Sequence, residues 1–478
     1  MATEPTSLAS RLFRTKSLDR ILADADRPEF RLRRSLSALD LTALGIGAII
    51  GTGIFVLIGT AVVGDAVRPG AGPGISLSFV LAGLACVLAA LCYAEFAAMI
   101  PVAGSAYTYS YATLGEFIAW ITGWNLILEY GVACVAVAIG WSGYFNRLLA
   151  LAGIDLPAWA THAPGGPEGG IINLPASIIV LLCTWILVVG VKESARITSV
   201  VVVLKLAVIL FFIGVGSTAV EPANWTPYMP NGFAGVSAAA AIVFFAYIGF
   251  DAVSTTAEEA RNPQRDIPIG IIASLVICTL LYITVAAVLT GMIPWQQVDV
   301  NAPIATALQQ LGFRWGAALV AIGAVAGITS VLLVMMIGQI RIFFVMARDG
   351  LLGPWLGAVH PRYRTPHHAT VLTGVVVAVL AGFVQIGAAA DMANIGTLFA
   401  FVLVCIGVVV LRRTRPAVTR PFRVPFMPVL PVLGAIACFL LMTGLPWVTW
   451  LRFCLWTALG IVVYLAYGLR RSRLAEGA

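Results

Sequence analysis

Three ionisable side chains interrupt long apolar stretches of the sequence and are its strongest candidates for chemistry. Glu129, Asp251 and Lys205 each fall near the centre of an apolar run. Ionisable groups at membrane depth are costly and usually bind a substrate or carry ions and protons. A purely structural ion pair is the alternative interpretation, and it is a stronger competitor for Lys205 than for the two acids.

Two glycine-containing segments break apolar runs in a way that would expose polar backbone. They are 45–55 (GIGAIIGTGIF) and 244–251 (FFAYIGFD). An unwound helix leaves N–H and C=O groups without partners, which membrane proteins tolerate only around a polar cavity. The N–H groups suit a carboxylate and the carbonyls suit an ammonium group, so the pair could bind an α-amino acid. Glycines that merely allow close helix packing are the alternative.

The composition indicates a membrane protein. The chain has 478 residues, of which 60% are hydrophobic and 11% charged, and its mean hydropathy is +0.97. Soluble domains have about 25% charged residues, so a water-soluble enzyme, a nucleic-acid-binding domain and a disordered chain are excluded. The eight cysteines lie in apolar runs without the spacing of metal ligands. We expect no metal, no cofactor, no nucleic-acid partner and no enzymatic activity.

The apolar runs predict an all-α polytopic membrane protein with twelve transmembrane helices. A span needs about 20 mostly apolar residues. The predicted spans are 40–64, 75–100, 115–145, 174–190, 194–216, 236–257, 268–292, 315–347, 369–387, 392–411, 428–445 and 451–469. The third and eighth are long enough to tilt or to project from the bilayer, and the fourth is short.

Lysine and arginine predict the orientation. If the N-terminus is cytoplasmic, 24 of the 29 Lys and Arg residues fall on the inner side, four fall outside and Lys205 lies within a span. This asymmetry follows the positive-inside rule and predicts a multi-pass protein of the cell (inner) membrane with both termini in the cytoplasm. Residues 1–39 form a cytoplasmic tail, either an amphipathic helix or loosely ordered chain, and residues 470–478 form a second tail.

The two interrupted spans occupy matching positions in two halves of the chain. Each begins a set of five spans, 40–216 and 236–411, and the sets start on opposite sides of the membrane. Interrupted helices at corresponding positions of inverted repeats point to the binding site of a transporter. Residues 428–469 would add two further helices outside the repeats.

Six short motifs carry a family resemblance that covers about residues 35 to 470. They are 45–55, 93–96 (YAEF), 101–109 (PVAGSAYTY), 124–130 (WNLILEY), 258–268 (EEARNPQRDIP) and 341–352 (RIFFVMARDGLL). In this order, the chain resembles the amino acid–polyamine–organocation (APC) superfamily and, within it, bacterial members of the cationic amino acid transporter family. The resemblance implies a leucine-transporter-type 5+5 inverted repeat and amino acid transport by alternating access.

The resemblance also implies roles for individual residues. Thr52, Gly53 and Ile54 would offer N–H groups to the substrate carboxylate. Carbonyls near Ile49, Phe245 and Ile248 would hold its ammonium group. Glu129 and Asp251 would face the substrate side chain, which favours arginine, lysine or ornithine because two buried acids need a countercharge.

Further roles concern coupling and gating. In proton-coupled relatives a lysine on the fifth helix replaces a sodium ion, so the resemblance gives Lys205 that role, with Thr329 and Ser330 as candidate partners. Phe250 or Phe245 would form an aromatic gate, and Met335 and Met336 would border the pocket. Bulky thioethers favour small substrates such as alanine, so cationic and small neutral amino acids both remain candidates.

These observations predict a proton-coupled symporter of amino acids whose partners are its substrate, protons and the bilayer. An amino acid or polyamine exchanger is the nearest alternative, and Lys205 favours the symporter. A channel and a non-transporting amino acid sensor are weaker alternatives. A small single-span accessory subunit stays open as a partner.

Overall fold

The computed structural model describes residues 12–16, 36–100, 102, 105–166, 169–190 and 195–472, with only the backbone for 195–199, 255 and 258. Within these ranges the regular structure is helical, and two isolated β-bridges, Leu36–Ala260 and Gly64–Pro69, are the only strand-like pairings. The all-α prediction is therefore confirmed for this part of the chain.

Helices occupy all twelve predicted segments. The first predicted span contains α3 (Ala38–Ile49), a π-helical turn η1 (Gly53–Leu57) and α4 (Ile58–Val63), and the sixth contains α11 (Gly232–Val243), a 3-10 turn η4 (Phe244–Tyr247) and α12 (Ala252–Thr255). The others are α5 (Ile75–Met99), α7 (Glu116–Leu151), α9 (Leu174–Val189), α10 (Ala195–Ser217), α13 (Pro263–Met292), α15 (Arg314–Arg348), α16 (His367–Phe383), α17 (Ile386–Thr414), α18 (Val429–Thr443) and α19 (Trp447–Val463), which continues through η8 (Tyr464–Gly468) into α20 (Leu469–Arg471).

Length and apolarity qualify fewer helices as spans than the sequence predicted. Eight described helices are long and apolar enough to cross a membrane, or nine if the bent pair of α3 with η1 and α4 counts as one span. The three shorter apolar helices are α9, α16 and α18, which coincide with predicted spans. The third and eighth predicted spans are indeed the longest, with 36 residues in α7 and 35 in α15.

Local sequence explains several helix ends. Ser37 and Asp40 form a reciprocal capping box at the start of α3, so its first N–H groups are satisfied. Asn173 caps the start of α9, and Gly190 ends that helix in the left-handed conformation. The start of the first predicted span and both ends of the fourth are thus encoded by residues at those helix ends.

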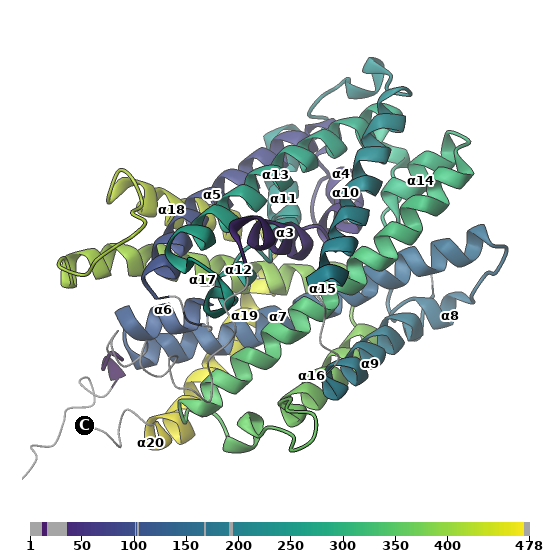
Figure 1. The fold of residues 1–478 in the computed structure, drawn as a ribbon. Coiled ribbons are helices and arrows are strands. Elements are labelled where there is room, and N and C mark those ends of the chain that lie inside the picture. Colours follow the sequence, from purple (N-terminus) through teal and green to yellow (C-terminus); the bar gives the residue numbers. More distant parts are fainter. Residues whose placement is uncertain are drawn as a thin grey trace, which may run out of the picture.

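The long helices pack against one another and surround the broken helices. α7 packs against α15 and α17, and α5 packs against α13. In Figure 1, α7 and α15 cross most of the molecule, while α3 and α12 lie near its centre. α3 contacts α13, α10 and α15, so the broken first span is enclosed by unbroken helices.

Small helices complete the connections. α6 (Ser105–Thr113) packs on α7, and α14 (Pro303–Gln310) packs on α15. Residues 146–173, between the third and fourth predicted spans, are helical up to Leu151, and beyond that their described part contains only the four-residue α8 (Ala158–Thr161). Most of the predicted N-terminal tail lies outside the described residues.

Candidate functional site

The first helix break lies between α3 and η1. Ile50 leaves the helix with φ −74° and ψ 101°, and the chain resumes helical geometry at Thr52 and Gly53. The two helical halves meet at an angle of 41°. The N–H groups of the first residues of a helix have no partner within that helix, so the start of the second half is a source of free donors.

The second break lies between η4 and α12. Ile248 has an extended ψ of 132°, and Gly249 has φ +119°, which side-chain-bearing residues rarely adopt. A Cβ at Gly249 would also lie 2.8 Å from the carbonyl oxygen of Ala48. Only glycine therefore satisfies both the dihedral and the close approach to α3.

The two breaks touch each other. A Cβ at Gly53 would lie 2.7 Å from the backbone nitrogen of Ala246, so the backbones of η1 and η4 are in direct contact. The Tyr282 hydroxyl of α13 lies 3.0 Å from the carbonyl oxygens of both Ile49 and Ala246. One buried tyrosine thus binds a carbonyl from each broken helix, a link that sequence reasoning missed.

Two buried carboxyl groups lie beside these breaks. Glu129 of α7 is 1% exposed and Asp251 is 2% exposed, and the two interact electrostatically. The Tyr130 hydroxyl donates to Asp251 Oδ2 at 2.8 Å, but Asp251 Oδ1 and Glu129 Oε2 have no hydrogen-bond partner. Buried acceptors are normally paired, so these two oxygens are free to accept bonds from a ligand.

Lys205 connects three helices. Its side chain is fully buried, and its ammonium group donates to the carbonyl oxygen of Gly47 at 2.6 Å. Its methylenes cover Gly327 of α15, where a Cβ would lie 2.9 Å away. The lysine of α10 therefore bonds α3 just before its break and packs on α15.

The predicted partners of Lys205 lie on α15 but do not bond it. Thr329 accepts from Trp141 Nε1 at 2.9 Å and donates to the carbonyl of Val325 at 2.7 Å. The Ser330 side chain has no hydrogen bond among the described interactions. Lys205 bonds a backbone carbonyl in place of the expected hydroxyl groups. Gly47 lies in the last turn of α3, next to the break, where carbonyl groups lack a partner further along the helix.

The remaining predicted residues are buried around the breaks. Thr52 packs against Gly140 of α7, and its hydroxyl has no partner. Val331 of α15 lies against Gly51, which places Met335 one turn further along the same face. Buried apolar side chains complete the set, namely Ile49, Ile54, Phe245, Ile248, Met335 and Met336.

Phe250 belongs to an aromatic cluster. Its ring centroid lies 5.7 Å from that of Tyr93 and 5.0 Å from that of Phe401, and all three rings are buried. Phe245 is 5% exposed and has no ring contact among the described aromatic pairs. Of the two candidate gate residues, Phe250 is held on both sides, whereas Phe245 is not.

Ion pairs at both ends of the helices were not predicted. At one end, Glu116 accepts from Arg14, Tyr111, Tyr464 and Ser472, so it joins both tails to α7. At the other end, Arg68 binds Asp391 at 2.7 Å and Asp65 at 2.6 Å, joining the loop after α4 to α17. Their partners are up to 356 residues apart in the sequence, so spacing carried no signal.

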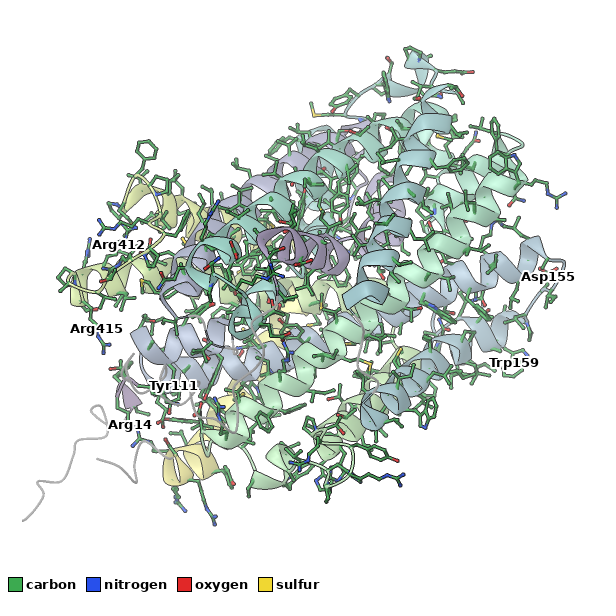
Figure 2. All side chains as sticks on the ribbon, in the orientation of Figure 1. Arg14, Tyr111, Asp155, Trp159, Arg412 and Arg415 are labelled. Carbon is green, nitrogen blue, oxygen red and sulfur yellow. The ribbon has the colours of Figure 1, made fainter. Side chains whose placement is uncertain are left out.

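The two ends differ in charge. Figure 2 shows Arg14, Arg412 and Arg415 toward one end of the molecule, which we call the arginine-rich end, and Asp155 and Trp159 at the opposite end. Glu259 lies 3.8 Å from Arg341, an ion pair that joins the segment after α12 to α15.

Known proteins are similar in sequence to this chain over almost its whole length. A family model described as amino acid permease matches residues 36–465. The chain is 50% identical over 465 residues to the methylthioribose transporter of Bacillus subtilis, covering 97% of this chain and 99% of the relative. It is also 50% identical over 468 residues to the branched-chain amino acid permease BcaP of that bacterium, with the same coverage. The vacuolar cationic amino acid transporter 4 of Arabidopsis thaliana is 38% identical over 413 residues, covering 85% of this chain and 68% of the relative.

Proposed function

The chain belongs to the amino acid permease family of the APC superfamily, and from this premise we propose that it is a proton-coupled amino acid symporter. Its relatives are named as permeases and transporters, so it is a transport protein rather than an enzyme. The observation that carries the proposal is the direct contact between two helix breaks beside two buried carboxyl groups.

We place twelve spans in the membrane, with 40–216 and 236–411 as inverted five-helix repeats and 428–469 outside them. Helices in every predicted segment support this assignment. The breaks support the repeats, because each falls in the first span of its half and the two meet at the centre of the molecule.

The breaks would bind the backbone of an amino acid. The N–H groups around Thr52, Gly53 and Ile54 suit its carboxylate, because a helix N-terminus carries partial positive charge. Carbonyls at the ends of α3 and η4 suit its ammonium group. The Ile49 carbonyl already accepts from Tyr282 but retains a second lone pair, so it can still contribute.

Two features compete in setting the side-chain preference. The unpartnered oxygens of Glu129 and Asp251 favour a cationic side chain, which would also supply their missing countercharge. Buried Phe245, Ile248 and Met335 favour an apolar one. The branched-chain permease is the more similar of the two amino acid transporters compared, so substrates with arginine-like and leucine-like side chains must be tested together.

Lys205 supports coupling to protons. A charged lysine bonded to Gly47 ties α10 to the end of α3, whereas a neutral lysine would weaken that bond. Proton release would therefore loosen the first helix break, which gives a physical link between protonation and access to the site.

The charge of the two ends supports the orientation. We assign the arginine-rich end to the cytoplasm, which places both termini inside and the protein in the cell (inner) membrane. Arg68 and Asp391 then lie on the outer side, and Glu116 on the inner side.

Uptake into proteoliposomes tests this function. The purified protein is assayed with labelled arginine, alanine and leucine, with and without an inward proton gradient, and with and without unlabelled amino acid inside. We expect saturable uptake driven by external acidity without internal substrate. Uptake that requires internal amino acid would identify an exchanger instead. Uptake that never saturates would indicate a channel, and binding without flux a sensor.

A further inference from the structure

An apolar groove runs along the cytoplasmic half of α13. Its volume is about 710 Å³, and it lies between α13 and the loop that joins α17 to α18. Its lining residues are Gln264, Arg265, Pro268, Ile269, Ile272, Ala273 and Val276 of α13, with Pro421 and Phe422 of the loop. From Arg265 to Val276 the helix rises about 16 Å, which is close to half the hydrocarbon thickness of a bilayer.

The groove is apolar along its length and positive at its mouth. Ile269 and Val276 expose 41% and 43% of their surface, so the helix face is open. Arg265 lines the groove, and Arg423 directly follows Phe422, which forms the opposite wall. Both arginines are exposed, and neither has a carboxylate partner within the described chain.

The loop wall is held rigidly. Arg420 donates to the carbonyls of Val418, Arg415 and Leu411, and Glu95 accepts from the backbone N–H of Val424 at 2.7 Å. The groove therefore exists before any ligand arrives, which lowers the entropic cost of binding.

Positive charge is in excess around this wall. Glu95 is shared between Arg412, Arg420 at 3.4 Å and the Val424 backbone, so one carboxylate faces several arginines. Burial lowers the pKa of Arg420, and repulsion from Arg412 and Arg423 acts in the same direction against the attraction of Glu95. An anion from outside the chain would offset this excess of positive charge.

We propose that this groove binds one anionic phospholipid of the cytoplasmic leaflet, with an acyl chain along α13 and the phosphate at Arg265 and Arg423. The site rests on the membrane orientation proposed above, but not on the identity of the transported substrate. Basic pockets at the cytoplasmic surface recognise acidic headgroups, and each arginine near the surface contributes about 1 kcal/mol.

The N-terminal tail is the competing occupant, and its charge argues against it. Leu36 pairs with the backbone of Glu259 and Arg261, so the tail joins the fold close to the start of α13. Directly before Leu36 the sequence contains Arg31, Arg33 and Arg34, while the acids Asp24, Asp26 and Glu29 lie further upstream. Like charges at the groove mouth would repel residues 31–34, whereas a phosphate would be attracted.

Lipid titration of the full-length protein tests the site. Retention of dioleoyl phosphatidylglycerol and dioleoyl phosphatidylcholine is measured by native mass spectrometry from detergent micelles. We expect one saturable phosphatidylglycerol per chain with clearly weaker phosphatidylcholine binding. Each substitution, Arg265→Gln or Arg423→Gln, should weaken phosphatidylglycerol binding about fivefold.

Two further variants make the test specific. Arg362→Gln removes an exposed arginine at the same end but outside the groove, and should leave binding unchanged. Ala273→Phe should fill the groove and reduce lipid retention without altering charge. Equal retention of both lipids by the native protein, or a phosphatidylglycerol preference that survives in the double arginine variant, would overturn the proposal.

Discussion

Lys205 and Tyr130 show how single side chains connect the elements of the site. Lys205 donates to the Gly47 carbonyl from α10, and Tyr130 donates to the Asp251 carboxyl group from α7. In each case the partner belongs to a broken span. Both bonds lie beside a helix break, where backbone groups lack their usual helical hydrogen bonds. Removing either bond should therefore destabilise the broken helices first.

Lys205→Ala should strongly reduce uptake driven by a proton gradient, because it removes the titratable bond to α3. We expect at least a tenfold loss of gradient-driven uptake, while exchange of internal for external amino acid persists. Lys205→Arg should show the same loss, since arginine keeps its proton. Proteoliposome flux measures both, and gradient-driven uptake by the alanine variant would contradict the role of Lys205.

Tyr130→Phe should destabilise the protein by about 1–3 kcal/mol, because it leaves a further oxygen of the buried Asp251 without a donor. Tyr144→Phe is the matched control on the same helix, where the hydroxyl donates to the carbonyl of Phe55 at 2.7 Å. Unfolding in detergent should show the larger loss for Tyr130→Phe. Equal losses would mean that the carboxyl group does not depend on this donor.

At the scale of elements, the two broken helices pack against each other at their breaks. Gly53 lies on the backbone of η4, and Gly249 lies on the backbone of α3, so each break supplies the space that the other needs. Tyr282 binds a carbonyl from both. A change that moves one break must therefore move the other.

Gly53→Ala and Gly249→Ala should each lower uptake at least tenfold, because a methyl group would collide with the backbone of the opposite broken span. Gly131→Ala in α7 and Gly214→Ala in α10 are matched controls, since a Cβ at either position meets no neighbouring atom within 4 Å. Uptake is measured at equal amounts of protein in the membrane. Normal uptake by Gly53→Ala would refute the tight contact of the breaks.

At the scale of the whole molecule, buried ion pairs join distant segments at both ends. Arg68 and Asp391 are each 8% exposed at the side chain and lie 2.7 Å apart, linking the first broken span's loop to α17. At the arginine-rich end, Glu116 connects the N-terminal segment, α7 and the C-terminal segment. The alternating access that the family resemblance implies would require these ends to open in turn, and the pairs would oppose that opening.

Arg68→Gln should destabilise the protein by about 3–5 kcal/mol, because it leaves the Asp391 carboxyl group buried without its partner. The double variant with Asp391→Asn should lose less than the sum of the two single losses, with a coupling of about 0.5–3 kcal/mol. Asp155→Asn, at an exposed position of the same end, should have no effect. Additive losses in thermal unfolding would show that the pair contributes nothing.

Much of the helical arrangement could be predicted because apolar segment length is a local property. The predicted ranges and the observed helices agree within a few residues for most segments, including both broken ones. The number of spans does not follow from length, because α9, α16 and α18 are short and their membrane placement depends on neighbouring helices. Helix length alone could not decide it.

The candidate site was only partly predictable. Glycine spacing and buried acids pointed to residues that the structure gathers around two touching breaks. Of the candidate partners of Lys205, Thr329 bonds Trp141 and Val325 in the structure, and the lysine donates to the carbonyl of Gly47. The identity of the free carbonyl depends on the exact residue at which the helix ends, and the local sequence does not predict that residue.

The sequence by itself determined that this chain is a helical membrane protein of the amino acid permease family, where its helices lie and which of them break. These follow from apolar run length, glycine content and short motifs along the chain, all of which are local. Only the tertiary structure decided that Tyr282 joins the two breaks, that Glu116 joins the two tails, and that Arg265 lies across a groove from Phe422. Such contacts depend on the packing of helices far apart in the chain, and packing is a property of the assembled fold.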